Sequence, residues 1–246
     1  MKQTARIAWV SAALLAMAGF AALGIWQIER LAWKRELIAR VERQMQAPPQ
    51  SPPEPARWAG LAKPDEYRRL RLQGRFEPGE VFVQASTELG GGFWVLAPLR
   101  LDDGAVVLVN RGFVPPERRA ADQHQAVGDG PVQLTGLLRL SEPHGGVLRE
   151  NEPQQDRWYS RDVGAIAARL GLRGPVAPFF VDEVADSSQP QRWPRPGLTV
   201  LRFSNNHAVY AATWFALAAM VAAAAGYLLF EERRRRAGAG AATLES

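Results

Sequence analysis

The fold is decided by a stretch at residues 7–28 that reads IAWVSAALLAMAGFAALGIWQI and contains no charged residue. A second uncharged stretch, residues 208–230, reads AVYAATWFALAAMVAAAAGYLLF. At 1.5 Å per residue, helices of 22 and 23 residues span roughly 33 Å, about the thickness of a bilayer's hydrocarbon core. A soluble domain rarely needs two such helices at its ends. We therefore expect residues 7–28 and 208–230 to be transmembrane helices.

Basic residues lie close to one end of each stretch. Lys2 and Arg6 precede the first, and four consecutive arginines at 233–236 follow the second. Such residues resist translocation and suit anionic lipid head groups, so they stay on the cytoplasmic side. The pattern predicts that both termini are cytoplasmic, with residues 231–246 as a basic tail, and that residues 29–206 form a domain on the other side of the membrane.

The N-terminal stretch has a second interpretation, a cleaved signal peptide over residues 1–25. Its apolar run is longer than the usual signal core of about 7–15 residues, so we expect it to be retained as a membrane helix. A span that begins at residue 7 leaves no room for a mitochondrial presequence. With the Ala/Arg-rich composition, this favours a multi-pass protein of the bacterial plasma (inner) membrane.

Charge and cysteine content exclude several classes of protein. Of the net charge of +5, the tails outside the two stretches carry +3 and residues 29–202 carry +2. This mixed-charge middle lacks the basic footprint of a nucleic-acid-binding domain. The chain has no cysteine, which excludes disulfides, a thiolate nucleophile, iron–sulfur clusters and Cys-ligated zinc.

The middle of the chain alternates between apolar and polar residues in short segments. Residues 29–46 continue the first helix, and five prolines at 48–55 end it. An Asp103-Gly104 pair predicts a tight hairpin turn, glycines 90–92 predict a flexible turn, and residues 162–170 predict a short helix capped by Ser160 or Asp162. We expect strands at residues 70–76, 81–86, 93–101, 105–110, 132–140, 178–184 and 198–203, with loops at 145–157 and 186–196. The fold class is a mainly antiparallel, barrel-like α+β domain flanked by two transmembrane helices.

No catalytic constellation is present in the sequence. His124 follows a Pro-Pro pair in a polar stretch and His144 lies in a Pro-His-Gly-Gly turn, so both are typical of surface residues. The carboxylates of Asp102 and Asp103 are explained by the hairpin turn. Glycines 90–92 precede no helix N-terminus that would bind phosphate. We therefore expect a protein that is not an enzyme.

His207 differs from the other histidines because it begins the second membrane helix. Tyr210, Ala211 and Trp214 fall on the same helix face by their spacing. An imidazole beside apolar and aromatic side chains at the membrane surface suits a haem iron ligand. The alternative is an interfacial anchor, since polar aromatic residues favour head-group depth.

The first membrane helix carries a matching group at its outer edge. Trp26 and Gln27 end the apolar stretch, and Arg30 and Trp33 follow. These residues either contribute to a site shared with His207 or form an aromatic belt with an arginine that reaches the head groups.

Three motifs resemble the Surfeit locus protein 1 family, also called the Shy-type family. They are LGIWQIERLAWKRELI at residues 23–38, LAPLRLDDGAVVLVNRGFVP at 96–115 and NNHAVYAATWFALA at 205–218. Shorter matches at residues 67–76 and 134–139 lie between them, and the resemblance covers about residues 23–230. Phe113 departs from the pattern, since many members have Trp there.

The resemblance implies an assembly factor for haem-copper terminal oxidases of the cytochrome c oxidase type in the respiratory chain. Such a protein binds haem a or delivers it to the largest oxidase subunit, which is the implied partner together with the haem a synthesis machinery. The family's proposed haem ligand falls on His207, its first motif on Trp26 and Gln27, and its Val-Asn-Arg-Gly motif on residues 109–112. Arg30 or Arg111 could pair with the haem propionates. The alternative is a membrane chaperone that docks the oxidase subunit without haem.

Overall fold

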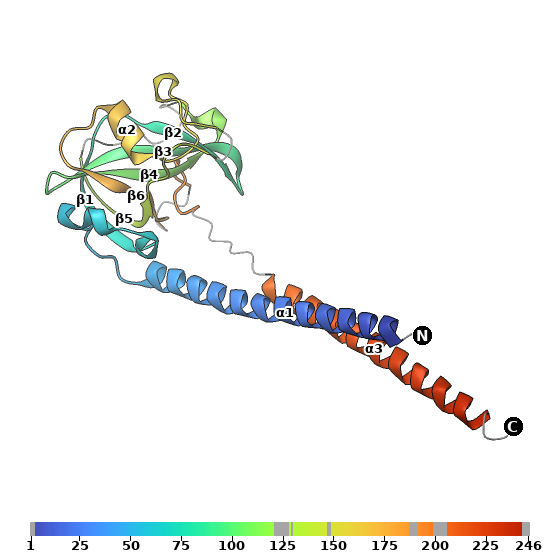
Figure 1. The fold of residues 1–246 in the computed structure, drawn as a ribbon. Helices are drawn as coiled ribbons and strands as arrows, with labels where there is room; N and C mark the ends of the chain where they lie inside the picture. Colours follow the sequence, from blue (N-terminus) through green and yellow to red (C-terminus); the bar gives the residue numbers. More distant parts are fainter. Residues whose placement is uncertain are drawn as a thin grey trace. The chain divides into compact units, whose positions relative to one another are not determined.

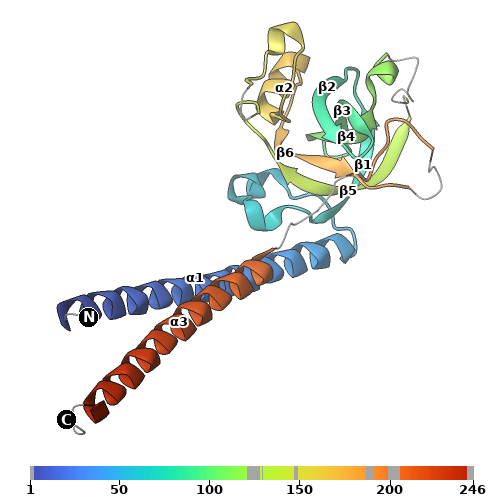
Figure 2. The same ribbon diagram turned by 90° about the vertical axis from the view of Figure 1, so that its right-hand side faces the viewer.

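The computed structural model describes residues 3–120, 128, 130–146, 149–186, 191–198 and 206–242 (Figures 1 and 2). The chain divides into two compact units. The helix pair comprises Met1–Ala39 and Arg202–Ser246, and the β domain comprises Arg40–Leu201. Residues 29–39 group with the helix pair, and the side of the membrane on which they lie stays a prediction.

The helices of the pair are α1, Gln3–Gln46, whose residues 40–46 group with the β domain, and α3, His207–Ala242. Each contains a segment long and apolar enough to cross a membrane, within Thr4–Gln46 and His207–Arg235. Helix α1 continues unbroken past residue 28, as the sequence predicts. An ion pair joins Arg6 Nε near the start of α1 to Glu232 Oε2 near the end of α3 at 3.5 Å. The rings of Phe20 and Trp214 stack at 5.8 Å nearer the other end, so the two helices run antiparallel (Figure 2).

The described residues of the β domain form six strands, which make one sheet in the order β1-β5-β6-β4-β3-β2. A further pairing of β1 with β3 closes five of them into a barrel. Only β4 and β6 run parallel; every other pair of named strands is antiparallel. The expected mainly antiparallel, barrel-like domain is therefore confirmed. The strands are β1 Arg69–Phe76, β2 Val81–Thr87, β3 Gly90–Leu101, β4 Val106–Val114, β5 Pro131–Leu140 and β6 Val176–Glu183.

Barrel closure depends on a glycine in β1. Gly74 pairs with Val132 of β5 and with Leu101 of β3. A Cβ atom built on Gly74 would lie 2.0 Å from the carbonyl oxygen of Arg100. Because a real side chain cannot come that close, glycine at this position lets one strand pair with both neighbours.

Two apolar clusters lie on the two faces of the sheet. The first fills the barrel and draws side chains from all five closing strands; its fully buried members include Leu70, Leu72, Leu99, Val107, Val109, Leu138, Phe179 and Val181. The second lies under α2 and β2 and includes Val81, Leu96, Leu108, Trp158, Ile166 and Phe180. Strand β4 supplies residues to both clusters and is buried along its whole length, so apolar residues point to both faces in its first half, Val106 to Val109, rather than alternating with polar ones.

Helix α2, Val163–Leu170, covers one side of the sheet (Figure 1). Of the two caps that the sequence allows, the structure uses Asp162, whose Oδ1 accepts a hydrogen bond from the Ala165 amide at 3.1 Å. Gly171 ends the helix with φ of 63°. Short 3-10 helices at Pro55–Gly60, Lys63–Asp65, Pro116–Arg118 and Pro153–Gln155 complete the described elements.

The prediction of a flexible turn at glycines 90–92 is wrong. These residues begin β3 and pair with Thr87, Ser86 and Ala85 of β2, and the turn is the pair Glu88-Leu89. Backbone pairing with β2 outweighs the cost of ordering glycine in a strand. The predicted strand at 198–203 lies outside the described residues, apart from Leu198, which belongs to no strand.

The predicted β3–β4 hairpin is confirmed, and its turn occupies the three residues between the predicted strands. Leu101 N donates to the Ala105 carbonyl at 2.8 Å, and Gly104 N donates to the Leu101 carbonyl at 2.9 Å. The turn thus contains Asp102, Asp103 and Gly104, and Gly104 has φ of +87°. This is the geometry of a three-residue hairpin loop, which needs a left-handed residue at its last position.

Gly104→Val should lower the free energy of unfolding by about 1–3 kcal/mol, because a β-branched residue is strained at positive φ. A Cβ at Gly104 would meet no atom within 4 Å, so the cost is backbone strain alone. The measurement is the thermal midpoint of the detergent-purified protein. Gly60→Val is the matched control, because its Cβ also meets nothing and its φ is not positive. Equal midpoints for the two variants would contradict the turn assignment.

Candidate functional site

His207 and Gln27 meet in the helix pair. His207 Nδ1 and Gln27 Oε1 lie 2.6 Å apart, although 180 residues separate them in the chain. An amide oxygen only accepts hydrogen bonds, so with Oε1 as the partner Nδ1 carries the ring proton. No hydrogen bond to Nε2 is found among the described residues. In the neutral imidazole with Nδ1 protonated, Nε2 carries the lone pair that can bind a metal.

Aromatic and small residues pack the two helices together next to the contact between Gln27 and His207, on the side of the N-terminus of α1. Trp214 of α3 stacks on Phe20 of α1, and a Cβ atom on Gly24 would lie 2.7 Å from the ring of Phe215. Ala211 of α3 is 6% exposed. The missing side chain at Gly24 allows the close approach that brings Gln27 within hydrogen-bonding distance of His207.

The other expected site residues of the helix pair lie near its surface. Trp26 is 50% exposed and Tyr210 is 55% exposed. The guanidinium of Arg30 lies 4.5 Å from the ring centre of Trp33. The structure therefore brings Gln27 and His207 together, places Trp214 against Phe20, and leaves Trp26, Tyr210 and Arg30 available to a lipid or a ligand.

Arg111 belongs to the β domain rather than to the helix pair. It is 4% exposed, and its Nη1 donates to Glu80 Oε1 at 2.6 Å. Burial lowers the pKa of Arg111, while the Glu80 charge and hydrogen bond oppose that shift. These contacts account for the arginine structurally, and its pairing with a propionate stays a prediction.

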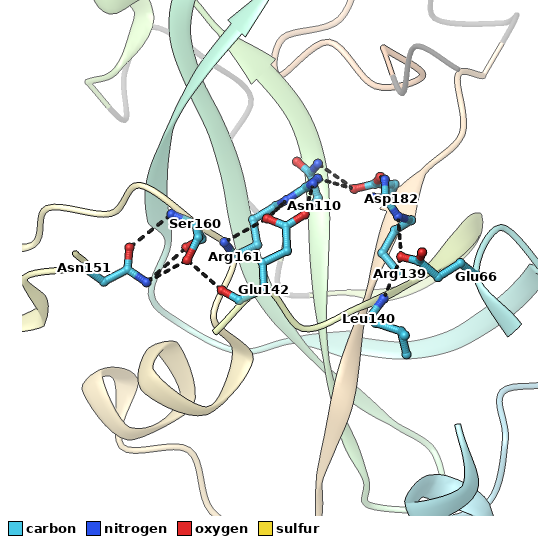
Figure 3. Close-up of polar contacts among 9 residues, drawn as sticks. All are labelled: Glu66, Asn110, Arg139, Leu140, Glu142, Asn151, Ser160, Arg161 and Asp182. Atoms are coloured by element: carbon cyan, nitrogen blue, oxygen red, sulfur yellow. Dashed lines mark hydrogen bonds and ion pairs between the residues drawn. The ribbon is translucent and has the colours of Figure 1, made fainter. Parts of the chain in front are cut away.

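A charged network in the β domain surrounds Asp182 of β6 (Figure 3). Asp182 is 3% exposed. Its Oδ1 accepts a hydrogen bond from Asn110 Nδ2 at 2.8 Å and lies 3.4 Å from Arg161 Nη1, and its Oδ2 accepts from Arg139 Nη1 at 3.1 Å. One carboxylate thus joins β4, β5 and β6 with the segment that leads into α2.

Two outer acids complete this network. Glu66 Oε1 accepts from Arg139 Nε at 3.3 Å, and Glu142 accepts from both Nε and Nη2 of Arg161 (Figure 3). Burial opposes ionisation of Glu142, but the hydrogen bonds and charge of Arg161 outweigh it and lower the pKa of Glu142. Charged neighbours, with Asp182 the strongest, outweigh the burial of Arg139 and raise its pKa. The network is a set of mutually satisfied ions, which indicates a structural role.

This network was not predicted from the sequence, although the position of Asp182 indicates that its carboxylate is buried. It stands in the run Phe179-Phe180-Val181-Asp182-Glu183, where a carboxylate follows three buried apolar residues. A charge within a buried strand needs a partner, and arginines on the neighbouring strand were the candidates. Within the part of the chain that the structure describes, no group of three or more His, Cys, Asp or Glu residues could hold a metal ion.

Comparison with known proteins agrees with the resemblance of the motifs. A family model described as the SURF1 family matches residues 14–219. The chain belongs to the SURF1 family. It is 34% identical over 222 residues to Surfeit locus protein 1 of Rattus norvegicus, covering 80% of this chain and 68% of that protein. The human protein of the same name is 33% identical over 221 residues, with 80% and 69% coverage. A SURF1-like protein of Monosiga brevicollis is 34% identical over 217 residues, with 80% and 78% coverage.

In this SURF1-family chain, the Val-Asn-Arg-Gly motif lies in β4, where its residues pack and form hydrogen bonds within the β domain. Val109 is fully buried in the barrel core, Asn110 binds Asp182, and Arg111 binds Glu80. Asn110 Oδ1 also accepts from the Gly112 amide at 3.1 Å. The motif is therefore explained by packing and hydrogen bonding within the β domain.

The residues of the helix pair fit haem a better than those of the β domain do. Among the described residues His207 Nε2 has no hydrogen-bond partner, and Gln27 Oε1 lies 2.6 Å from the other ring nitrogen. The surrounding helix faces are apolar, with exposed Ile25, Ile28 and Val209. A porphyrin ring needs one strong axial nitrogen and apolar contact surface, and this SURF1-family helix pair provides both.

Proposed function

We propose that this chain is a membrane-anchored assembly factor for a haem-copper oxidase of the cytochrome c oxidase type, which holds haem a for delivery to the largest oxidase subunit. Membership of the SURF1 family supports the assembly role. The single observation that carries the haem proposal is the contact between Gln27 and His207 in a pair of apolar helices. The role needs no chemistry from the protein itself.

His207 is the proposed axial ligand. When bound, haem a supplies an iron ion that accepts a nitrogen lone pair, and His207 Nε2 offers one. A single protein histidine holds the group less firmly than two would, which suits a carrier that must release its cargo. The partly exposed Trp26 and Tyr210 and the cation of Arg30 are proposed to contact the ring edge and the propionates.

The proposal places the protein in a bacterial inner membrane, with the largest oxidase subunit and the haem a synthesis machinery as partners. Two helices of sufficient length and apolarity support membrane insertion.

The test is a visible spectrum of the detergent-purified protein made in cells that synthesise haem a. The expected result is a pigment with the pyridine haemochrome spectrum of haem a, in an amount close to one haem per chain. A colourless protein from the same cells would overturn the haem proposal and favour a chaperone that docks the oxidase subunit without haem.

Membrane orientation is tested with alkaline phosphatase, which is active only outside the cytoplasm. Basic residues flank the two spans on one side, so a fusion after Ser246 should be inactive. The same enzyme inserted at Gly128, in the β domain, should be active. Strong activity of the Ser246 fusion would refute cytoplasmic termini.

A further inference from the structure

Gln27 is the most buried polar side chain among the described residues of the helix pair. It is 8% exposed and lies at the end of the apolar stretch of α1. Its Oε1 is 2.6 Å from His207 Nδ1, and among the described residues neither side chain makes another hydrogen bond. A buried amide is costly unless it is hydrogen-bonded, so the two side chains stabilise each other's position.

We propose that Gln27 is a positioning residue for His207: its amide oxygen holds the imidazole as the tautomer with Nδ1 protonated, so that Nε2 is the free iron-binding nitrogen. This inference rests on the haem function proposed above. Metal-binding histidines commonly donate their second ring N–H to an oxygen, which sets the tautomer, orients the ring and makes the ligand more basic. Gln27 has that role here and does not bind the iron itself.

The choice of an amide has a functional consequence. A carboxylate at this position would draw the Nδ1 proton more strongly and give the ring imidazolate character, which tightens the iron–nitrogen bond. An apolar side chain would leave the ring free to rotate and to take the other tautomer. The neutral amide lies between these limits, so it orients the ligand while leaving the iron bond weak enough for release.

The alternative is that this hydrogen bond only helps to hold the two helices together and has no effect on the ligand. Phe20, Gly24, Trp214 and Phe215 form the packing contacts of the pair independently of Gln27. A variant that removes the amide should therefore keep the helices paired. A change in the tautomer or in the iron bond of such a variant separates positioning from a merely structural role.

The first experiment needs no haem. In detergent-purified, haem-free protein with His124→Asn and His144→Asn, the ¹⁵N shifts of the remaining imidazole report the tautomer of His207. We expect a proton on Nδ1 in this background and a mixture with the Nε2-protonated form after Gln27→Leu. A proton on Nε2 before the substitution would mean that Gln27 donates instead, and would overturn the inference.

The second experiment compares Gln27→Leu, wild type and Gln27→Glu with haem a bound. The ferrous iron–histidine stretching frequency should rise in that order and the midpoint potential should fall, because a stronger acceptor at Nδ1 makes Nε2 a stronger donor. Gln27→Leu should also retain haem about 10- to 100-fold more weakly. Equal frequencies and potentials in all three proteins would overturn the inference while leaving the haem function intact.

Helix pairing is the control. Because the chain has no cysteine, spin labels can be attached to cysteines introduced at Leu15 and Met220, which are 74% and 60% exposed on α1 and α3. The distance between the labels should be the same in wild type and Gln27→Leu. A longer distance in the variant would assign its effects to loss of packing and overturn the positioning role. A colourless wild-type protein would refute the proposed function, and the tautomer measurement would still decide the role of Gln27.

Discussion

His207→Ala should remove most of the haem a that co-purifies with the protein. The imidazole is the proposed iron ligand, and its Nε2 has no hydrogen-bond partner among the described residues. Loss of a residue that only supports a metal ligand typically costs about 10- to 100-fold in affinity, so loss of the ligand should cost no less. The measurement is the haem a content per purified chain from the pyridine haemochrome spectrum.

Two histidine variants serve as controls. His124→Ala should keep the pigment, since residue 124 is far from the helix pair in the sequence. His144 lies in the β domain with φ of 72°, so His144→Asn is the better replacement there, because Asn tolerates the left-handed region. Membrane insertion of His207→Ala should be normal. A full haem complement with an unchanged spectrum in His207→Ala would show that the ligand is a different residue.

Asp182→Asn should destabilise the β domain by about 2–4 kcal/mol. The change keeps the size of the side chain but removes the charge that Arg139 and Arg161 share. Breaking a buried ion pair costs about 3–5 kcal/mol because it leaves an uncompensated charge. The cost here is somewhat smaller, since Glu66 and Glu142 still pair with the two arginines. In a domain of this size the thermal midpoint should fall by about 5–15 °C.

The control for this prediction is an ion pair at the surface of the same domain. Glu152 pairs with Arg157 at 3.6 Å, and both side chains are well exposed. Glu152→Gln should cost less than about 0.5 kcal/mol, because exposed pairs contribute little. If Asp182→Asn melts at the same temperature as this control, the network does not stabilise the barrel.

Most local structure followed from short-range patterns. Two uncharged stretches were enough to predict the apolar helices, because helix length and apolarity are properties of consecutive residues. Alternation predicted β1 and β5, the Asp-Gly pair predicted the β3–β4 hairpin, and the candidate caps Ser160 and Asp162 predicted α2. The motifs likewise placed Gln27 and His207 among the site residues.

Pairing across long sequence distances was not predictable in this way. Whether glycines 90–92 form a turn or a strand depended on β2 as their partner. Closure of the barrel depended on β1 pairing with both β5 and β3 at Gly74. These outcomes depend on which segments meet, and the composition of each segment alone does not specify that.

The sequence by itself determined the two apolar helices and the strand-rich middle, since each follows from neighbouring residues. It also singled out His207 as the predicted haem ligand, which stays a prediction. Only the tertiary structure decided that Gln27 is the partner of His207 across 180 residues, and that Arg111 pairs with Glu80 inside the β domain. The tertiary structure also decided that Asp182 contacts Asn110 and two arginines from separate segments of the chain. A hydrogen bond or ion pair needs atoms within about 3 Å, and that distance is set by how the elements pack.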